Sequence, residues 1–189
     1  IFTLGNKQRG RAKTKFATVR YGNVVASRGS VIPLFKKQIE EGGPITLTDK
    51  RMTRFILTLT QAMKLIFNAL SDMVGGEVFV PRIKPLKVYD LANVMISMLK
   101  PKDRRIIEIG VRPGEKLHET LISPIESLRA KKKSNYYVVL PQIELKEIGF
   151  TYKTPNLIRR EYRYSSDNGE FMSRKEIENV LMEEGIFTN

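Results

Sequence analysis

The chain has 189 residues, of which 41% are hydrophobic, a composition typical of a globular protein with a sizeable core. It contains no cysteine, which excludes a disulfide scaffold and a Cys-ligated metal site. No stretch approaches the roughly 18 apolar residues of a membrane-spanning helix, and no secretory signal pattern is present.

The formal net charge is +13 at pH 7, which is typical of proteins with a polyanionic partner such as nucleic acid, a membrane surface or a phosphorylated small molecule. Six basic residues and no acidic residue lie between positions 7 and 20, and Lys131, Lys132 and Lys133 form a second cluster. Such clusters are also typical of solvated loops. The charge alone therefore leaves the class of partner open.

Strand and helix patterns alternate along the chain, which predicts an α/β protein. Residues 1–5 are typical of the last turn of a helix that stops at Gly5 or Asn6, and a basic loop follows to residue 13. In chain order, the further predicted elements are a strand at 15–21, a helix at 31–41, strands at 45–48 and 77–80 flanking a helix at 60–73, a helix at 87–99, a strand at 105–111, a helix at 119–129, a strand at 136–140 and a helix at 173–185. Ser173 and Glu176 form a capping-box pattern at the start of the last helix.

The first segment that could bind a ligand, residues 20–33, leaves the carboxyl end of a predicted strand, where open α/β sheets bind their ligands. Gly22 and Gly29 allow a close approach of the backbone, and Asn23 offers both a donor and an acceptor. The alternative is a connecting loop with a helix cap.

Two further segments carry arginines. Arg54 lies just before the predicted helix at 60–73, and its planar guanidinium suits a diphosphate; the alternative is a surface arginine paired with Asp49. Arg112 and Glu115 flank a Pro-Gly turn after a predicted strand, where Arg112 could bind phosphate and Glu115 could accept hydrogen bonds from ribose hydroxyls. The alternative is an ordinary strand-to-helix turn.

His118 is the only histidine, and without a second histidine or a cysteine a transition-metal site is improbable. We interpret it as a structural residue. The carboxylates show no pairing that requires general acid–base chemistry; those considered are Asp49, Asp90, Glu115 and Glu119.

The chain resembles the extended short-chain dehydrogenase/reductase superfamily in four segments: RYGNVVASRGSVIP, TDKRMTRF, GGEVFVP and IGVRPGEKLHE. More narrowly, it is similar to the inverting UDP-N-acetylglucosamine 4,6-dehydratases of the polysaccharide-biosynthesis group. The stretch YSSDN at 164–168 is most similar to the soluble members that begin pseudaminic acid synthesis for flagellin glycosylation.

The resemblance implies a fold class: the C-terminal part of a Rossmann-type α/β enzyme with a smaller substrate-binding domain. Residues 1–33 are expected to end the NADP-binding Rossmann domain, and residues 34–189 to form mainly the UDP-sugar-binding domain, with short segments returning to the Rossmann sheet. The first strand, the Gly-rich turn and the Tyr-x-x-x-Lys motif of the family are not found, so the chain is expected to start in mid-fold.

The resemblance also implies a reaction, the NADP-dependent removal of water from a UDP-sugar with inversion at C5. In this family the catalytic residues precede the segment that begins this chain. No catalytic residue is therefore expected here, the chain alone is expected to be inactive, and no metal is expected.

Binding residues transfer from the family position by position. The substrate-binding positions implied are Asn23, Val31, Thr48, Arg54, Arg112 and Glu115. The cofactor-binding positions implied, beside the nicotinamide of NADP, are Val24, Val25, Ala26, Ser27 and Arg28.

The expected partner is a UDP-sugar rather than nucleic acid, and the full-length protein is expected to be a cytoplasmic homo-oligomer. Three alternatives stay open: another UDP-sugar epimerase or dehydratase of the same superfamily, a basic nucleic-acid-binding module, and a non-enzymatic scaffold. A nucleic-acid module would show binding that falls steeply with salt.

Overall fold

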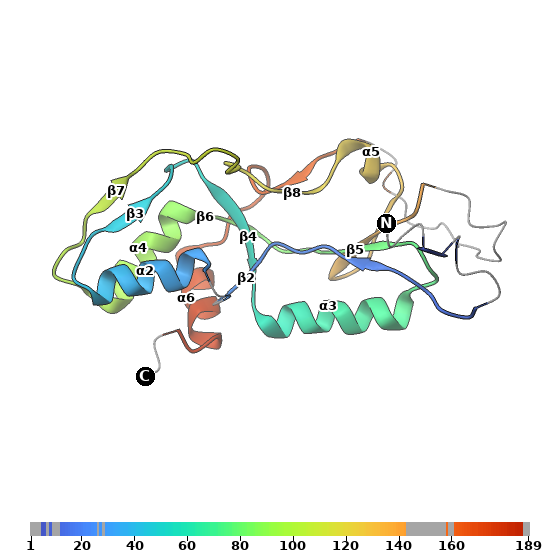
Figure 1. The fold of residues 1–189 in the computed structure, drawn as a ribbon, viewed down its shortest axis with the longest axis horizontal. Coiled ribbons are helices and arrows are strands. Elements are labelled where there is room, and N and C mark those ends of the chain that lie inside the picture. The colour runs from blue at the N-terminus through green and yellow to red at the C-terminus, as the bar shows by residue number, and fades with distance from the viewer. Residues whose placement is uncertain are drawn as a thin grey trace. The chain divides into compact units, whose positions relative to one another are not determined.

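The computed structural model describes residues 5, 6, 8, 12–25, 27, 29–142, 158 and 161–186. The chain forms two compact units that interleave along the sequence (Figure 1). Unit 1 comprises Ile1–Tyr21, Thr60–Arg82 and Thr120–Tyr164, and unit 2 comprises Gly22–Leu59, Ile83–Glu119 and Ser165–Asn189. Each unit therefore draws its core from segments far apart in sequence.

Unit 1 contains a four-stranded sheet with the order β1-β5-β10-β9. The short strand β1 runs parallel to β5, and β10 runs antiparallel to both β5 and β9. The helix α3 packs on this sheet through Leu65 and Ala69, which meet Phe79, Tyr136 and Val138. The elements of this unit are β1 (Thr18–Val19), α3 (Leu59–Asp72), β5 (Val78–Pro81), β8 (Thr120–Ile122), α5 (Pro124–Ser127), β9 (Ala130–Lys132) and β10 (Tyr136–Val139).

The segment predicted as a helix at 119–129 is instead the strand β8 followed by the single turn α5, so that prediction was wrong. Pro124 is the cause, because proline disfavours a helical conformation in the residue before it and is tolerated only in the first turn of a helix. Ser123 is extended and accepts a hydrogen bond from the backbone of Glu126, which starts α5 with a capping box.

Unit 2 contains a three-stranded sheet with the order β2-β4-β6 and a separate parallel pair, β3 and β7. Three helices, α2, α4 and α6, supply its apolar core together with these strands. The elements are β2 (Asn23–Val24), α2 (Val31–Glu40), β3 (Ile45–Leu47), β4 (Thr53–Leu57), β6 (Pro85–Lys87), α4 (Val88–Leu99), β7 (Ile106–Glu108) and α6 (Arg174–Glu183). Strand β11 (Tyr164–Ser165) falls on the boundary between the units.

The helices predicted at 31–41, 60–73, 87–99 and 173–185 are confirmed within one or two residues at each end. The capping box of Ser173 and Glu176 is also confirmed. The strands predicted at 15–21 and 105–111 are shorter than expected, and β2, β4, β6, β9 and β11 were missed. Apart from β4, the missed strands have only two or three residues, which is too short to show an alternating pattern.

The prediction for the first residues was wrong. Gly5, Asn6 and Gln8 are helical, so the helix does not stop at Gly5 or Asn6, and the loop does not start there. Arg54, expected just before a helix, lies within strand β4. The assignment of residues 1–33 and 34–189 to two functional domains stays a prediction. Within the described residues, no helix is long and apolar enough to cross a membrane.

Candidate functional site

Unit 2 contains a cavity of about 370 Å³, a size within the range of small-molecule binding sites. All six residues predicted to bind substrate line it. They are Asn23, Val31, Thr48, Arg54, Arg112 and Glu115. The structure therefore gathers into one place side chains that the sequence spreads over about half of the chain.

The parallel pairing of β3 and β7 explains this convergence. Ile45 pairs with Ile106 and Leu47 with Glu108, so both strands end at the same edge. Thr48 directly follows β3, and the turn that carries Arg112 and Glu115 follows β7. Ligands of open α/β sheets bind at such carboxyl ends.

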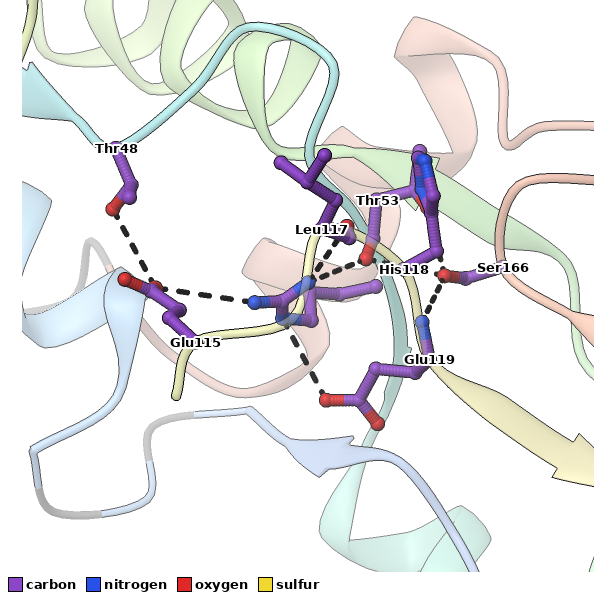
Figure 2. A network of polar contacts seen from close by, with 8 residues as sticks. Thr48, Thr53, Glu115, Leu117, His118, Glu119 and Ser166 are labelled. Atoms are coloured by element: carbon purple, nitrogen blue, oxygen red, sulfur yellow. Dashed lines mark hydrogen bonds and ion pairs between the residues drawn. The ribbon is translucent and has the colours of Figure 1, made fainter. Parts of the chain in front are cut away.

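Arg54 reaches the cavity from β4 with a side chain only 12% exposed. Its Nη1 donates hydrogen bonds to the carbonyl oxygens of Thr53, at 2.8 Å, and Leu117, at 3.0 Å. Its Nη2 lies 3.9 Å from Oε1 of Glu115, and its Nε lies 3.6 Å from Oε1 of Glu119 (Figure 2). Backbone carbonyls thus fix one side of the guanidinium, and carboxylates flank the other.

The alternative of a surface arginine paired with Asp49 is wrong. Asp49 pairs instead with Arg51, whose Nη2 lies 2.7 Å from Oδ2 of Asp49. Hydrogen bonds from the Arg51 side chain and backbone lower the pKa of Asp49 to about 2. Two arginines three positions apart thus have different environments: Arg51 is a surface residue and Arg54 faces the cavity.

A chain of hydroxyl and imidazole groups supports the segment that faces Arg54 (Figure 2). Oγ1 of Thr53 lies 2.8 Å from Nδ1 of His118 and 2.7 Å from Oγ of Ser166. The amide of Glu119 donates to the same Ser166 oxygen at 2.8 Å. These contacts tie residues 117–119 to β4, which fits the structural interpretation of His118. Sequence reasoning missed Ser166 and Glu119 as parts of the site.

Three buried oxygen atoms of the cavity make no hydrogen bond within the described part of the chain. They are Oδ1 of Asn23, Oγ of Ser30 and Oε2 of Glu115. Leaving such an atom unpaired costs about 1–3 kcal/mol, so native structures usually satisfy it. Amide and carboxylate oxygens only accept hydrogen bonds. The cavity is thus suited to a ligand that presents hydroxyl or N–H donors.

Positive charge and an apolar wall complete the cavity. Arg112 is exposed and forms no ion pair among the described residues, and Arg54 lines the same cavity from strand β4. Apolar side chains line part of the wall: Val31, Leu34, Phe35, Leu47, Met52, Val88 and Ile109. The arrangement suits a molecule with an anionic group, hydroxyls and one apolar face.

The residues predicted to bind the cofactor are only partly described. Val24 lies on β2 and is half-buried, whereas the side chain of Val25 packs in the apolar core of unit 2. The amide of Ser27 donates to the carbonyl of Val24 at 3.3 Å. Ala26 and Arg28 lie outside the described residues. If Val25 contacts a cofactor, it would therefore do so through its backbone.

Gly22 was expected to allow close approach of a ligand, but the group that approaches it is protein backbone. A Cβ atom at position 22 would lie 2.2 Å from the carbonyl oxygen of Phe55. Gly22 therefore permits the pairing of β2 with β4, which places Asn23 at the cavity. Across the described residues, no group of three or more His, Asp or Glu side chains could hold a metal ion.

One cavity of this α/β chain gathers two arginines, a glutamate and an asparagine, and part of its lining follows the carboxyl ends of the parallel strands β3 and β7. The chain is a member of the extended short-chain dehydrogenase/reductase superfamily. The family model described as polysaccharide biosynthesis protein matches residues 1–141. The chain belongs to that family.

Relatives and a solved structure agree with this assignment. The chain is 38% identical over 189 residues to a UDP-N-acetylglucosamine 4,6-dehydratase (inverting) of Campylobacter jejuni, covering 96% of this chain and 55% of the relative. It is 34% identical over 173 residues to a UDP-glucose 4-epimerase of Rickettsia bellii, covering 91% and 50%. The X-ray structure of Pen from Bacillus thuringiensis superposes with a TM-score of 0.86 at 34% identity, covering 99% of this chain and 55% of that one. The chain thus spans about half the length of the relatives it matches.

Proposed function

We propose that the cavity of unit 2 binds the nucleotide part of a UDP-sugar. One observation carries this proposal: a single cavity holds two arginines together with three buried acceptor atoms that have no partner in the described part of the chain. Arg54 and Arg112 would bind the diphosphate, because a guanidinium can form paired hydrogen bonds to phosphate oxygens.

The acceptor atoms assign roles to the remaining residues. Oε2 of Glu115 would accept hydrogen bonds from ribose hydroxyls, and the Asn23 amide would contact the sugar. Val31 and Thr48 would lie near the uridine, where the apolar wall that begins at Val31 suits the face of the base. A polar ligand bound in this way would satisfy the unpaired acceptors.

For the complete protein we propose an NADP-dependent UDP-N-acetylglucosamine 4,6-dehydratase that inverts C5. The support is the Campylobacter jejuni relative of that name. We further propose a cytoplasmic homo-oligomer that supplies nucleotide sugars for surface polysaccharide or, by way of pseudaminic acid, for flagellin glycans. The second candidate is a UDP-sugar 4-epimerase, which the Rickettsia bellii relative favours.

The cofactor, when bound, would supply hydride transfer, and the residues that move protons are expected outside this chain. Val24 and Ser27 have side chains small enough to let a flat nicotinamide ring approach the segment after β2. What this chain supplies is orientation: the arginines would hold the diphosphate, and Asn23 would direct the sugar.

Product mass separates the two candidate reactions. The complete protein is incubated with UDP-N-acetylglucosamine and the product is analysed by mass spectrometry. A dehydratase yields a sugar lighter by one water molecule, whereas an epimerase yields a product of unchanged mass. A product of unchanged mass would contradict the proposed dehydration.

The binding role is tested by Arg112→Ala with Lys116→Ala as a matched control. Both side chains are exposed and lie in the same turn, but only Arg112 lines the cavity. Loss of a charged hydrogen bond costs about 1.5–3 kcal/mol. Calorimetry with UDP should therefore show affinity reduced by at least about tenfold for Arg112→Ala, and little change for Lys116→Ala. Equal affinities of the two variants would contradict the assignment.

A further inference from the structure

The guanidinium of Arg54 has one edge that the protein leaves available to a ligand. Nη1 is occupied by the carbonyls of Thr53 and Leu117. The Nε and Nη2 edge faces the carboxylates of Glu119, at 3.6 Å, and Glu115, at 3.9 Å. Both distances exceed the length of a hydrogen bond. Nε and Nη2 of Arg54 therefore lie near negative charge but remain available to donate hydrogen bonds to a phosphate.

The net formal charge of the residues that line the cavity does not favour the binding of phosphate. The charged residues that line the cavity are two arginines, Arg54 and Arg112, and two glutamates, Glu115 and Glu119. Their formal charges therefore cancel. The cancellation is local, because the whole chain carries +13. A carboxylate beside the phosphate-binding arginine weakens attraction for any anion, and more strongly for an anion of higher charge.

Glu115 has a role that accounts for its carboxylate, since its buried Oε2 is a free acceptor. Glu119 has no such role. Its amide holds Ser166, but within the described residues its carboxylate contacts only Arg54. The Glu119 side chain is 33% exposed and lines the cavity, so its charge acts on whatever binds there.

We propose that Glu119 determines specificity by charge, favouring nucleoside diphosphate sugars over free nucleoside diphosphates. The proposal rests on the proposed function of the cavity. In a UDP-sugar both phosphates are esterified, and the diphosphate carries about two negative charges. Free UDP has a terminal phosphate whose second pKa lies near 6, so at pH 8 it carries about three. Glu119 would repel that additional charge while leaving the UDP-sugar bound by the two arginines.

The test compares affinities for two ligands in three proteins by calorimetry at pH 8 and low salt. The ligands are UDP and UDP-N-acetylglucosamine, and the proteins are the wild type, Glu119→Gln and Glu170→Gln. Glutamine keeps the size and shape of glutamate but removes its charge and replaces one acceptor oxygen by an amide donor. Glu170 is the matched control, because it loses the same charge from a side chain that is 78% exposed and lies outside the cavity lining.

We expect Glu119→Gln to increase the affinity for UDP relative to that for UDP-N-acetylglucosamine by about three- to thirtyfold, the range for one unit charge acting over several ångströms at intermediate dielectric. Glu170→Gln should leave the ratio unchanged. If Glu119→Gln alters both affinities by the same factor, Glu119 acts only on the position of Arg54 and the charge-selection proposal fails. If the folded wild type binds neither ligand, the proposed function fails instead.

Discussion

Replacing Arg54 by lysine removes the planar guanidinium but keeps the positive charge. Nη1 of Arg54 holds two backbone carbonyls, of Thr53 and Leu117, while its other edge faces two carboxylates. A single ammonium group can reach only one of these sides. The variant therefore loses either the charged hydrogen bonds to the carbonyls or the ion pairs with the carboxylates, at a side chain that is only 12% exposed, which costs about 2 kcal/mol of unfolding free energy.

The matched control is Arg51→Lys, three positions earlier. Arg51 also pairs with a carboxylate, but its side chain is 74% exposed, and exposed ion pairs contribute about 0–1 kcal/mol. Urea unfolding followed by circular dichroism measures both variants, and the thermal midpoint of Arg54→Lys should fall by about 4–8 °C. If the two lysine variants lose the same stability within about 0.5 kcal/mol, the contacts described for Arg54 do not stabilise the fold as argued.

Three further perturbations test single contacts. Gly22→Ala should lower the unfolding free energy by about 3 kcal/mol or more, because the new Cβ would lie 2.2 Å from the carbonyl oxygen of Phe55; a variant as stable as the wild type in urea would refute that close approach. Thr53→Val should cost about 1–3 kcal/mol, since it removes a buried hydroxyl with two side-chain partners, and Thr53→Ser should restore most of that loss. Burial raises the pKa of Glu126, but hydrogen bonds, led by that from Arg20, outweigh it and leave the pKa at about 2, below the ordinary 4.5. The Arg20–Glu126 pair therefore stabilises the fold fully above about pH 4.5, and this contribution is lost as the pH falls toward 2. Between these pH values the unfolding free energy of Glu126→Gln should fall less than that of the wild type.

The place of the site could be predicted from the sequence because strand ends carry ligands in open α/β sheets. Thr48 follows one predicted strand, and Arg112 and Glu115 follow another. Local patterns identified both strands, even though β7 is shorter than expected. Their parallel pairing then places the side chains at one edge. The residues that line the cavity could thus be named from the sequence before their geometry was known.

The contacts within the site could not be predicted, because they join residues that no local pattern relates. Thr53 and Ser166 are separated by 113 positions. The pairing of Arg54 with Glu119 depends on how the segment after the Pro-Gly turn lies against β4. The strand around Arg54 was missed, since a short apolar run does not distinguish a strand from the start of a helix.

A ¹H–¹⁵N NMR titration of the labelled chain with UDP asks directly whether the cavity of unit 2 binds the nucleotide. If the cavity of unit 2 binds the nucleotide, amide shifts should saturate and concentrate at Asn23, Ser30, Thr48 and Glu115, which come from three separate segments of its lining. Shifts centred on the lysine cluster at 131–133, or a folded chain whose spectrum does not change at millimolar UDP, would contradict the account.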